Sequence, residues 1–342
     1  MPVLFLLVIQ VSTIDDQHVP PMLIKFGGVP SPLDHQASCL VIALYSRSTR
    51  TLWFNCRMET PVKRFPAHGW LGLGLTAVFW TLNWSLTGLR TQWAFFPLWL
   101  GYCLTVDALV VLRTGTSLLT RNWKKYIGLF LASAPVWWLF ELANWRLQNW
   151  QYVGAEAFST LQFWFWATLN FTIVIPAVFG SAELARSFLP KRVYGPVISP
   201  TRAVTIGFFT TGWLMLALMA AWPNIFFPFI WFSLYFLLEP INIWLGQRTL
   251  VEWTKDGNWQ PVISLWLGVL VTAFFWEMWN YLSYPKWVYH VSWGSWLHIF
   301  EMPLLGYGGY LPFALELFAL YHMLAGLLGG KKTYYVVNSS EE

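Results

Sequence analysis

The chain has 342 residues, of which 56% are hydrophobic and only 11% are charged, and its formal net charge is +5. Soluble globular proteins are usually about 25% charged, so this composition excludes an ordinary soluble domain and predicts an all-α, polytopic membrane protein. The sequence lacks the short alternating segments of a membrane β-barrel, and the positive charge is expected in membrane-flanking loops rather than on a nucleic-acid-binding surface.

The opening 57 residues differ from the rest. The stretch MPVLFLLVIQ is apolar but lacks the basic start and the clear small-residue cleavage site of a signal peptide. We expect residues 1–57 to be a poorly structured extension or an annotation artefact, with the native start at Met58. Residues 58–200 and 201–330 are then predicted to be two four-helix membrane repeats, followed by a cytoplasmic tail at 331–342.

Long apolar stretches follow one another from residue 70 onward and predict about eight membrane-spanning helices. The expected spans are 70–89, 94–112, 126–143, 161–180, 203–222, 224–245, 261–281 and 309–328. Segment 296–308 is apolar but short and rich in Gly and Pro, so we interpret it as a re-entrant or interfacial piece.

The basic residues between these spans are strongly asymmetric. Fourteen Lys and Arg residues flank one side of the predicted membrane region, and three flank the other. The positive-inside rule places the richer side in the cytoplasm. The sequence therefore predicts a multi-pass protein of the plasma membrane with both termini in the cytoplasm.

The second half of the sequence resembles the first. The stretch WWLFELANWRLQNWQYV at 137–153 is similar to FFWEMWNYLSYPKWVYHV at 274–291, and both contain the pattern E-x-x-N…W-x-Y. The matched pairs are Asp107 with Glu239, Glu141 with Glu277, Asn144 with Asn280, Trp150 with Trp287, and Tyr152 with Tyr289. Four spans per unit give both units the same orientation, which predicts parallel repeats with a site at their interface.

Two acid–amide pairs end spans on the outer side, Glu141 with Asn144 and Glu277 with Asn280. The i, i+3 spacing puts both members of a pair on one helix face. An acid at membrane depth usually faces the bundle interior and has a role, so these carboxyls could donate a proton or bind a ligand. Alternatively, the pairs fasten helix ends to the following loops, for instance through Arg146.

The other acids and the histidines allow more than one interpretation. Asp107 and Glu239 lie near the inner ends of two spans. We expect them to cap backbone groups or to form ion pairs at the membrane interface. His298 and Glu301 are spaced i, i+3, which suits a metal on a helix, but no second His stands at a matching distance. We expect these side chains to form hydrogen bonds or handle protons, or simply to be exposed to water at the opening of the bundle. They are His290, His298, Glu301 and Glu316.

No cofactor or metal is predicted. The sequence has no phosphate-binding glycine loop, dinucleotide-binding pattern, HExxH or nucleophile elbow. Its three Cys residues, Cys39, Cys56 and Cys103, have neither disulfide nor zinc spacing. The 25 Trp residues are the compositional outlier. They can form interfacial belts and helix contacts, or they can line a binding cavity.

The order of residues in the second repeat resembles the membrane lycopene cyclase domain of carotenoid synthesis. Glu277 matches that family's acid late in a helix, Trp287 and Tyr289 its aromatic linker, and Pro303-Leu304 the start of its P-L-E-E motif. Leu305 and Gly306 replace the two acids of that motif, and Glu301 precedes the Pro. The resemblance implies redox-neutral chemistry started by a proton, with a neutral acid as donor and aromatic faces around the cation.

The sequence is compatible with three functions. The first is an enzyme or binder for a lipophilic, isoprenoid-like molecule, with the lipid bilayer as its surroundings and Glu277, Glu301 and Glu141 handling protons. The second is a transporter built on two repeats, and the third is a structural membrane subunit. The expected substrate-binding residues are Asn280, Asn144, Trp287, Tyr289, His290, His298, Glu316, Trp150 and Tyr152.

Overall fold

The computed structural model describes residues 39–43, 52–56 and 64–329, which fall into two units considered separately. In the first unit, β1 (Cys39–Ala43) pairs antiparallel with β2 (Leu52–Cys56). Apart from these two strands, the expected N-terminal extension lies outside the described residues, as does the expected tail at 331–342.

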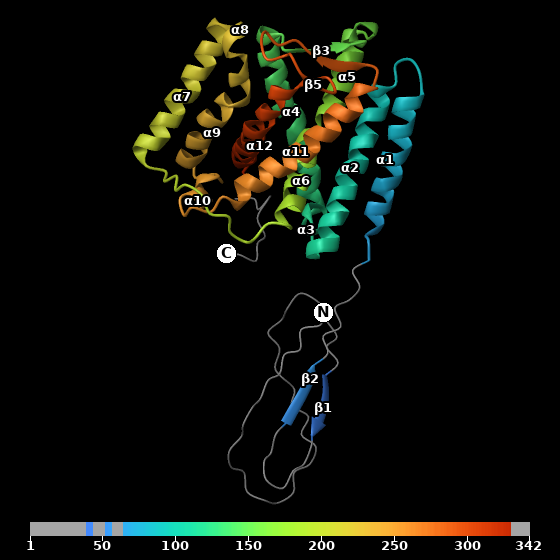
Figure 1. The fold of residues 1–342 in the computed structure, drawn as a ribbon, viewed down its shortest axis with the longest axis vertical. Coiled ribbons are helices and arrows are strands. Elements are labelled where there is room, and N and C mark those ends of the chain that lie inside the picture. The colour runs from blue at the N-terminus through green and yellow to red at the C-terminus, as the bar shows by residue number, and fades with distance from the viewer. Residues whose placement is uncertain (1–38, 44–51, 57–63, 330–342) are drawn as a thin grey trace, which may run out of the picture. The chain divides into compact units, whose positions relative to one another are not determined.

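The second unit is a bundle of helices with short strands at one end (Figure 1). Its long helices are α1 (Ala67–Ser85), α2 (Thr91–Thr114), α4 (Trp123–Leu147), α5 (Thr160–Phe171), α6 (Val174–Arg186), α7 (Arg202–Ala221), α9 (Ser233–Trp244), α11 (Gln260–Tyr281) and α12 (Tyr307–Leu327). Shorter helical pieces are α3 (Leu118–Arg121), η1 (Ala155–Ala157), α8 (Pro223–Phe226), η2 (Phe227–Trp231), α10 (Val251–Thr254) and η3 (Leu304–Gly306).

The protein is helical and membrane-embedded. Among the described residues, six helices are long and apolar enough to cross a bilayer, and a bent pair brings the number to seven. The sequence places a helix correctly at each of the eight expected positions, but α1, at the first, does not belong to this apolar set. Apolar side chains such as Leu131, Leu142 and Leu214 are largely exposed, as lipid-facing positions require.

The expected continuous span at 224–245 is wrong in one respect, because the helix is broken. Helices α8 and η2 together make an angle of 43° with α9. Pro228 lies in η2 and has no N–H to donate, so a regular α-helix cannot run through it. Glu316 of α12 accepts a hydrogen bond from Leu234 N at 2.9 Å and thereby caps the restarted helix α9.

The predicted span at 161–180 also contains a break, between α5 and α6. Pro176 cannot donate to the carbonyl four residues before it, and its ring clashes with that carbonyl. Ser133 of α4 supplies the missing partners: its hydroxyl donates to Phe171 O at 2.6 Å and accepts from Ile175 N at 3.1 Å. A buried serine therefore joins the two helix ends.

Helices of the two halves of the chain pack against each other reciprocally. Helix α11 packs on α6, and α4 packs on α12. At the first crossing Gly268 lies so close to the backbone of Ala182 that an added Cβ would be 2.3 Å from Ala182 N. A small residue is therefore required where these helices meet.

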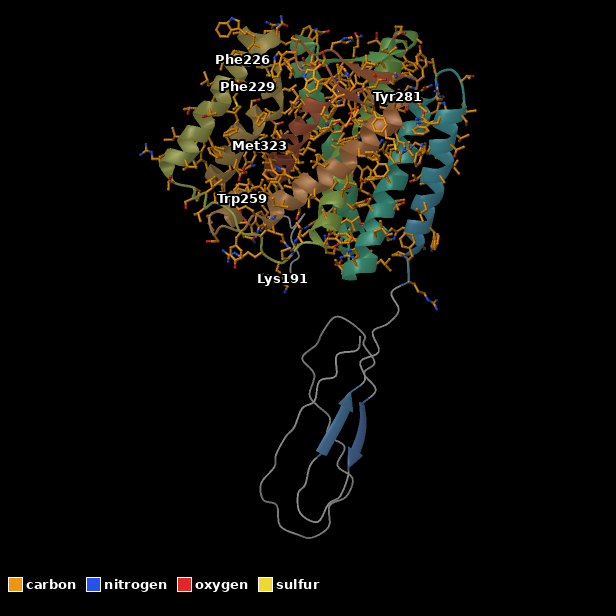
Figure 2. The ribbon with its side chains drawn as sticks, viewed as in Figure 1. Lys191, Phe226, Phe229, Trp259, Tyr281 and Met323 are labelled. Carbon is orange, nitrogen blue, oxygen red and sulfur yellow. The ribbon has the colours of Figure 1, made fainter. Side chains whose placement is uncertain are left out.

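A two-stranded ribbon also joins the halves at one end of the bundle. Strand β3 (Trp150–Val153) pairs antiparallel with β4 (Lys286–Tyr289), so that Trp150 faces Tyr289 and Tyr152 faces Trp287. A second small hairpin, β5 (His298–Ile299) with β6 (Met302–Pro303), lies within the segment expected to be re-entrant or interfacial. Figure 1 shows β3 and β5 at the end of the bundle opposite α3 and α10. In Figure 2, Phe226 and Phe229 lie near the ribbon end and Lys191 lies near the other.

We predict that Ser133→Ala will lower the free energy of unfolding by about 1–3 kcal/mol, because it leaves a buried amide and a buried carbonyl without partners. Reversible denaturation in mixed micelles measures this change. Ser85→Ala is the matched control, since Ser85 is exposed and bonds only to Thr81 O within its own helix. Equal stability of the two variants would contradict the role of Ser133.

Candidate functional site

The two asparagines of the repeated motif fix the ribbon to the helix ends. Asn144 Nδ2 donates to Trp150 O at 2.8 Å, and its Oδ1 accepts from Trp150 N at 3.3 Å. Asn280 Nδ2 donates to Trp287 O at 2.8 Å, and its Oδ1 accepts from Trp287 N at 3.0 Å. Each amide thus holds the backbone of one tryptophan by both its donor and its acceptor. This is the fastening role that the sequence left open for these residues.

Glu141 is surrounded by aromatic hydrogen-bond donors. Its Oε1 accepts from Trp137 Nε1 at 2.9 Å, from Trp150 Nε1 at 3.1 Å and from the Tyr152 hydroxyl at 2.5 Å. Arg146, the other expected partner of this region, instead donates to the main-chain oxygen of Ala220. The carboxyl of Glu141 is therefore held by three aromatic side chains.

Glu277 is held in a similar way and is fully buried. Its Oε1 accepts from the Tyr289 hydroxyl at 2.7 Å and from the Tyr310 hydroxyl at 2.6 Å. Trp287 Nε1 donates to the Tyr289 hydroxyl at 3.0 Å, which extends the chain of hydrogen bonds. Tyr152 with Glu141 and Tyr289 with Glu277 are therefore matching contacts from the two motifs.

The ribbon tyrosines keep their protons under all ordinary conditions. Burial raises the pKa of Tyr289 well above its usual value, and the neighbouring Glu277 raises it further. Burial and the adjacent Glu141 raise the pKa of Tyr152 in the same direction. Because both phenols stay protonated, both remain hydrogen-bond donors to their carboxyl partners.

A cavity of about 540 Å³ lies between the halves, next to the ribbon. Its size falls within the range of about 300–1,000 Å³ typical of small-molecule sites. The first half contributes α2, α4, α5 and β3 to the walls, and the second half contributes η2, α11, β4 and α12. The aromatic lining includes Trp137, Trp150, Trp231, Trp276, Tyr310 and Phe313.

The aromatic rings around this cavity support one another. Trp231 stacks on Trp150 with 5.9 Å between ring centroids and meets Phe313 edge-on at 5.5 Å. Trp276 stacks on Tyr310 at 6.2 Å. Such packed rings form a rigid wall whose faces favour apolar or transiently cationic groups.

Neither Glu141 nor Glu277 belongs to the described lining of the cavity. Their donors do: Trp137, Trp150 and Tyr152, which donate to Glu141, line it, and so do Tyr289 and Tyr310, which donate to Glu277. Each carboxyl therefore lies behind aromatic groups that touch both the acid and the cavity.

The remaining residues of the expected cluster spread over the ribbon end. Glu301 forms an ion pair with Lys286, and only Lys286 lines the cavity. His290 Nε2 lies 2.5 Å from Gln151 Nε2 and is exposed, as is His298 on β5. The pair of His298 and Glu301 is not on a helix but on and beside a β-hairpin.

Three of the other buried acids, Asp107, Glu239 and Glu316, bind backbone amides. Asp107 accepts from Leu119 N at 3.0 Å and from the Ser117 hydroxyl at 2.6 Å. Glu239 accepts from Val251 N at 2.9 Å. The capping expected for Asp107 and Glu239 is thus confirmed. Glu316, expected at the binding site, caps α9 instead, because the break at Pro228 leaves amides that need an acceptor.

Several residues of the site are missed by the sequence analysis. Trp137 stands four residues before Glu141 on the same helix, and this i, i+4 spacing is a signal that could have found it. Trp231, Trp276, Tyr310 and Phe313 come from three other elements and follow no local pattern. Only the folded chain brings them to one cavity.

We predict that Asn280→Ala will lower the free energy of unfolding by about 1–3 kcal/mol, since the half-buried Trp287 backbone loses both hydrogen bonds to the amide. Asn144→Ala should have a similar effect through Trp150. Denaturation followed by tryptophan fluorescence measures both. Gln151→Ala, an exposed amide on the same ribbon, serves as the control; a loss as large in this control would contradict the fastening role.

The chain has no match among known proteins in three comparisons: no family model, no curated protein and no solved structure matches it. The cavity and the two acids behind its walls are the features of the described chain that bear on its function.

Proposed function

We propose that the protein binds a lipophilic small molecule of the isoprenoid or carotenoid type in the aromatic cavity between its halves and moves protons to or from it. The observation that supports this most directly is the placement of Glu277. Its carboxyl is hydrogen-bonded to two tyrosine hydroxyls whose rings line the cavity.

The cavity suits such a ligand in size and in chemistry. Its lining is dominated by indole, phenol and phenyl rings, and Lys286 is the only charged side chain in the described lining. An elongated hydrocarbon gains the free energy of apolar burial there, about 25 cal/mol for each Å² removed from water. A strongly charged ligand would lose its hydration without a matching partner.

The two acids provide a route for a proton in each direction. In the proposed reaction, the Tyr310 hydroxyl gives its proton to a carbon of a double bond, and protonated Glu277 replaces that proton. A C–H bond forms, the π bond breaks, and the cation lies against aromatic faces. Loss of a proton from a neighbouring carbon through Tyr152 to ionised Glu141 restores a double bond. The sum for the ligand is an isomerisation or cyclisation without oxidant or reductant, as the lycopene cyclase resemblance implies. One proton has then moved from Glu277 to Glu141, and it must be returned to Glu277 before the next turnover.

We further propose that the two halves are parallel four-helix repeats. The matched contacts of Asn144 and Asn280 support this, as do those of Tyr152 and Tyr289. At the opposite end, Asp107 accepts from Leu119 N and Glu239 accepts from Val251 N, twelve residues later in both halves. The ribbon pairs each motif's Trp with the other's Tyr, which is the exchange that a two-fold axis along the membrane normal produces.

A transporter is the second candidate, because the helix broken at Pro228 contributes Phe227 and Trp231 to the cavity. In transporters, the free N-terminus of a half-helix often binds an anionic group of the substrate. Here Glu316 already occupies the N-terminus of α9. This internal cap favours a binding protein or an enzyme over a transporter that would use that helix end.

We predict that the purified protein carries a specific isoprenoid-like lipid, identified by extraction and mass spectrometry. Trp231→Ala should reduce the bound lipid several-fold, because the cavity loses a ring that packs against Trp150 and Phe313. Glu277→Gln should keep the lipid but change its isomer or cyclisation state, since the amide cannot supply the proton.

Asp256→Asn is the matched control for this experiment. Asp256 is an exposed acid in the loop after α10, at the end of the bundle opposite the ribbon. Equal amounts of the same bulk lipids in all four proteins, at equal folding yield, would overturn the binding proposal. Lipid that is bound but unchanged by Glu277→Gln would overturn the proton transfer alone.

We also propose that the end of the bundle opposite the ribbon, where α3 and α10 lie, faces the cytoplasm. Both termini would then be in the cytoplasm. A fluorescent protein fused to the C-terminus should then be fluorescent in cells. Alkaline phosphatase fused after Gly154, beside the ribbon, should be active, and the same enzyme fused after Ser187, beyond α6, should be inactive. The reverse activities would overturn this orientation.

A further inference from the structure

The loop between α6 and α7, residues 187–201, joins two segments that are long and apolar enough to cross a bilayer. The segment before it ends at Arg186, and the segment after it begins at Arg202. A loop between two such spans lies at a membrane surface. Figure 2 shows Lys191, which belongs to this loop, at the end of the bundle opposite the ribbon. Its exposed side chains are therefore within reach of lipid headgroups.

One side of the loop is packed onto the segment between α10 and α11. Trp259 N donates to Val193 O at 2.7 Å, and Trp259 Nε1 donates to Pro196 O at 2.8 Å. Gly195 N donates to Gly257 O at 3.0 Å. A Cβ added to Gly195 would lie 2.3 Å from Cδ1 of the Trp259 ring. These contacts fix the backbone of the loop, so its outward side is already formed without a partner.

Several side chains on the outward side are aromatic or apolar. Phe188 is 65% exposed, Tyr194 is 80% exposed and Val197 is 66% exposed. Side chains of this kind favour the boundary between lipid headgroups and acyl chains. Three of them in one loop between two spans indicate a surface that rests on a membrane.

Basic side chains accompany these apolar ones. Lys191, Arg192 and Arg202 are exposed, and residues 187–202 contain no Asp or Glu. Arg192 Cζ lies 4.9 Å from the centroid of the Tyr194 ring. Juxtamembrane clusters of Lys and Arg attract anionic lipids. The loop therefore combines positive charge with side chains that favour hydrocarbon.

A further basic side chain reaches the loop from α2. Arg113 Cζ lies 3.4 Å from the centroid of the Phe188 ring, and Arg113 Nε donates to Ser187 Oγ at 2.6 Å. The adjoining segment adds Lys255 and Asp256, both exposed, whose charges cancel. A soluble anion would balance the positive charges but leave the rings in water. An uncharged lipid would cover the rings but bring no net charge to the basic groups.

We propose that this loop rests on the membrane surface and binds anionic phospholipids. Lys191, Arg192 and Arg202 then contact the headgroup phosphates, while Tyr194 and Val197 lie at the boundary with the acyl chains. None of these residues belongs to the described lining of the aromatic cavity. The inference is consequently independent of the ligand proposed for that cavity.

A fluorescent NBD label attached to Val197→Cys reports which lipids lie beside the loop. Cys39 and Cys56 are replaced by Ser in every protein, and Cys103 is buried. The protein is reconstituted in phosphatidylcholine vesicles with a small share of spin-labelled phosphatidylglycerol or spin-labelled phosphatidylcholine. We expect the phosphatidylglycerol to quench the label as if it were about 5-fold or more enriched beside it. Raising NaCl from about 0.05 to 0.5 M should reduce this preference, because salt screens the charges.

Lys191→Gln combined with Arg202→Gln removes two positive charges and leaves the contacts of Arg192 in place. We expect the preference for phosphatidylglycerol to fall about 5-fold or more, with quenching by phosphatidylcholine unchanged. Arg146→Gln is a control, because Arg146 is an exposed basic residue at the end of α4 beside the ribbon. It should leave the preference intact. A label on Ala157→Cys, an exposed position in η1, should show no preference.

Each outcome decides one part of the inference. Quenching by neither lipid would place the loop in water and overturn the proposal. Equal quenching by both lipids at low salt would overturn the selectivity for anionic lipids. A preference that survives the double substitution would overturn the assignment to Lys191 and Arg202. Displacement of phosphatidylglycerol by glycerol 3-phosphate would assign the surface to a soluble phosphate instead. If the double variant fails to fold, the two lipids and the salt dependence still decide.

Discussion

A bilayer interior offers no water to an unpaired amide or carbonyl, and this constraint accounts for most of the buried polar side chains of the bundle. At four points where a helix ends, breaks or restarts, a side chain from elsewhere satisfies the exposed backbone. Ser133 joins α5 to α6, Glu316 caps α9, and Asp107 and Glu239 hold the segments that follow α2 and α9. The polar groups therefore mark the irregular points of the backbone.

Glu141 and Glu277 do not follow this pattern, and for this reason we propose a role for them in the chemistry of the cavity. Neither is engaged in a described hydrogen bond to a backbone amide; both accept from aromatic side chains. Glu183, another buried acid, pairs with Arg121 at 2.5 Å. Carboxyls that neither cap a helix nor balance a charge are costly to keep at membrane depth. The proposed proton transfer uses their contact with the rings that line the cavity.

The ribbon explains how two such groups come to share one cavity. Antiparallel pairing of β3 with β4 places the Trp of each motif opposite the Tyr of the other. The asparagines hold both strands close to their own helices, and the aromatic donors of Glu141 and Glu277 line the same cavity. The reciprocal packing of α4 on α12 and α11 on α6 surrounds that space with elements of both halves. Rigid walls of this kind favour a ligand that fits without rearrangement.

The sequence by itself determined the membrane character, the positions of the helices and the motif that contains Glu141, Asn144, Glu277 and Asn280. These follow from composition, from local apolar runs and from a repeated spacing, all of which are properties of short segments. The sequence could not distinguish acids that cap a helix from acids that accept hydrogen bonds from aromatic side chains. The partner of Glu316 is 82 residues away in the chain, and the partner of Glu277 on α12 is 33 residues away.

The tertiary structure alone decided where the cavity lies and which residues line it. Trp231, Tyr310, Gln92 and Asn170 follow no common pattern in the chain, since each is carried to the cavity by a different element. The break at Pro228 could be suspected from the proline, but its cap could not. Hydrogen bonds between distant segments depend on how helices cross, and helix crossing depends on close contacts such as Gly268 on Ala182, which no local spacing encodes.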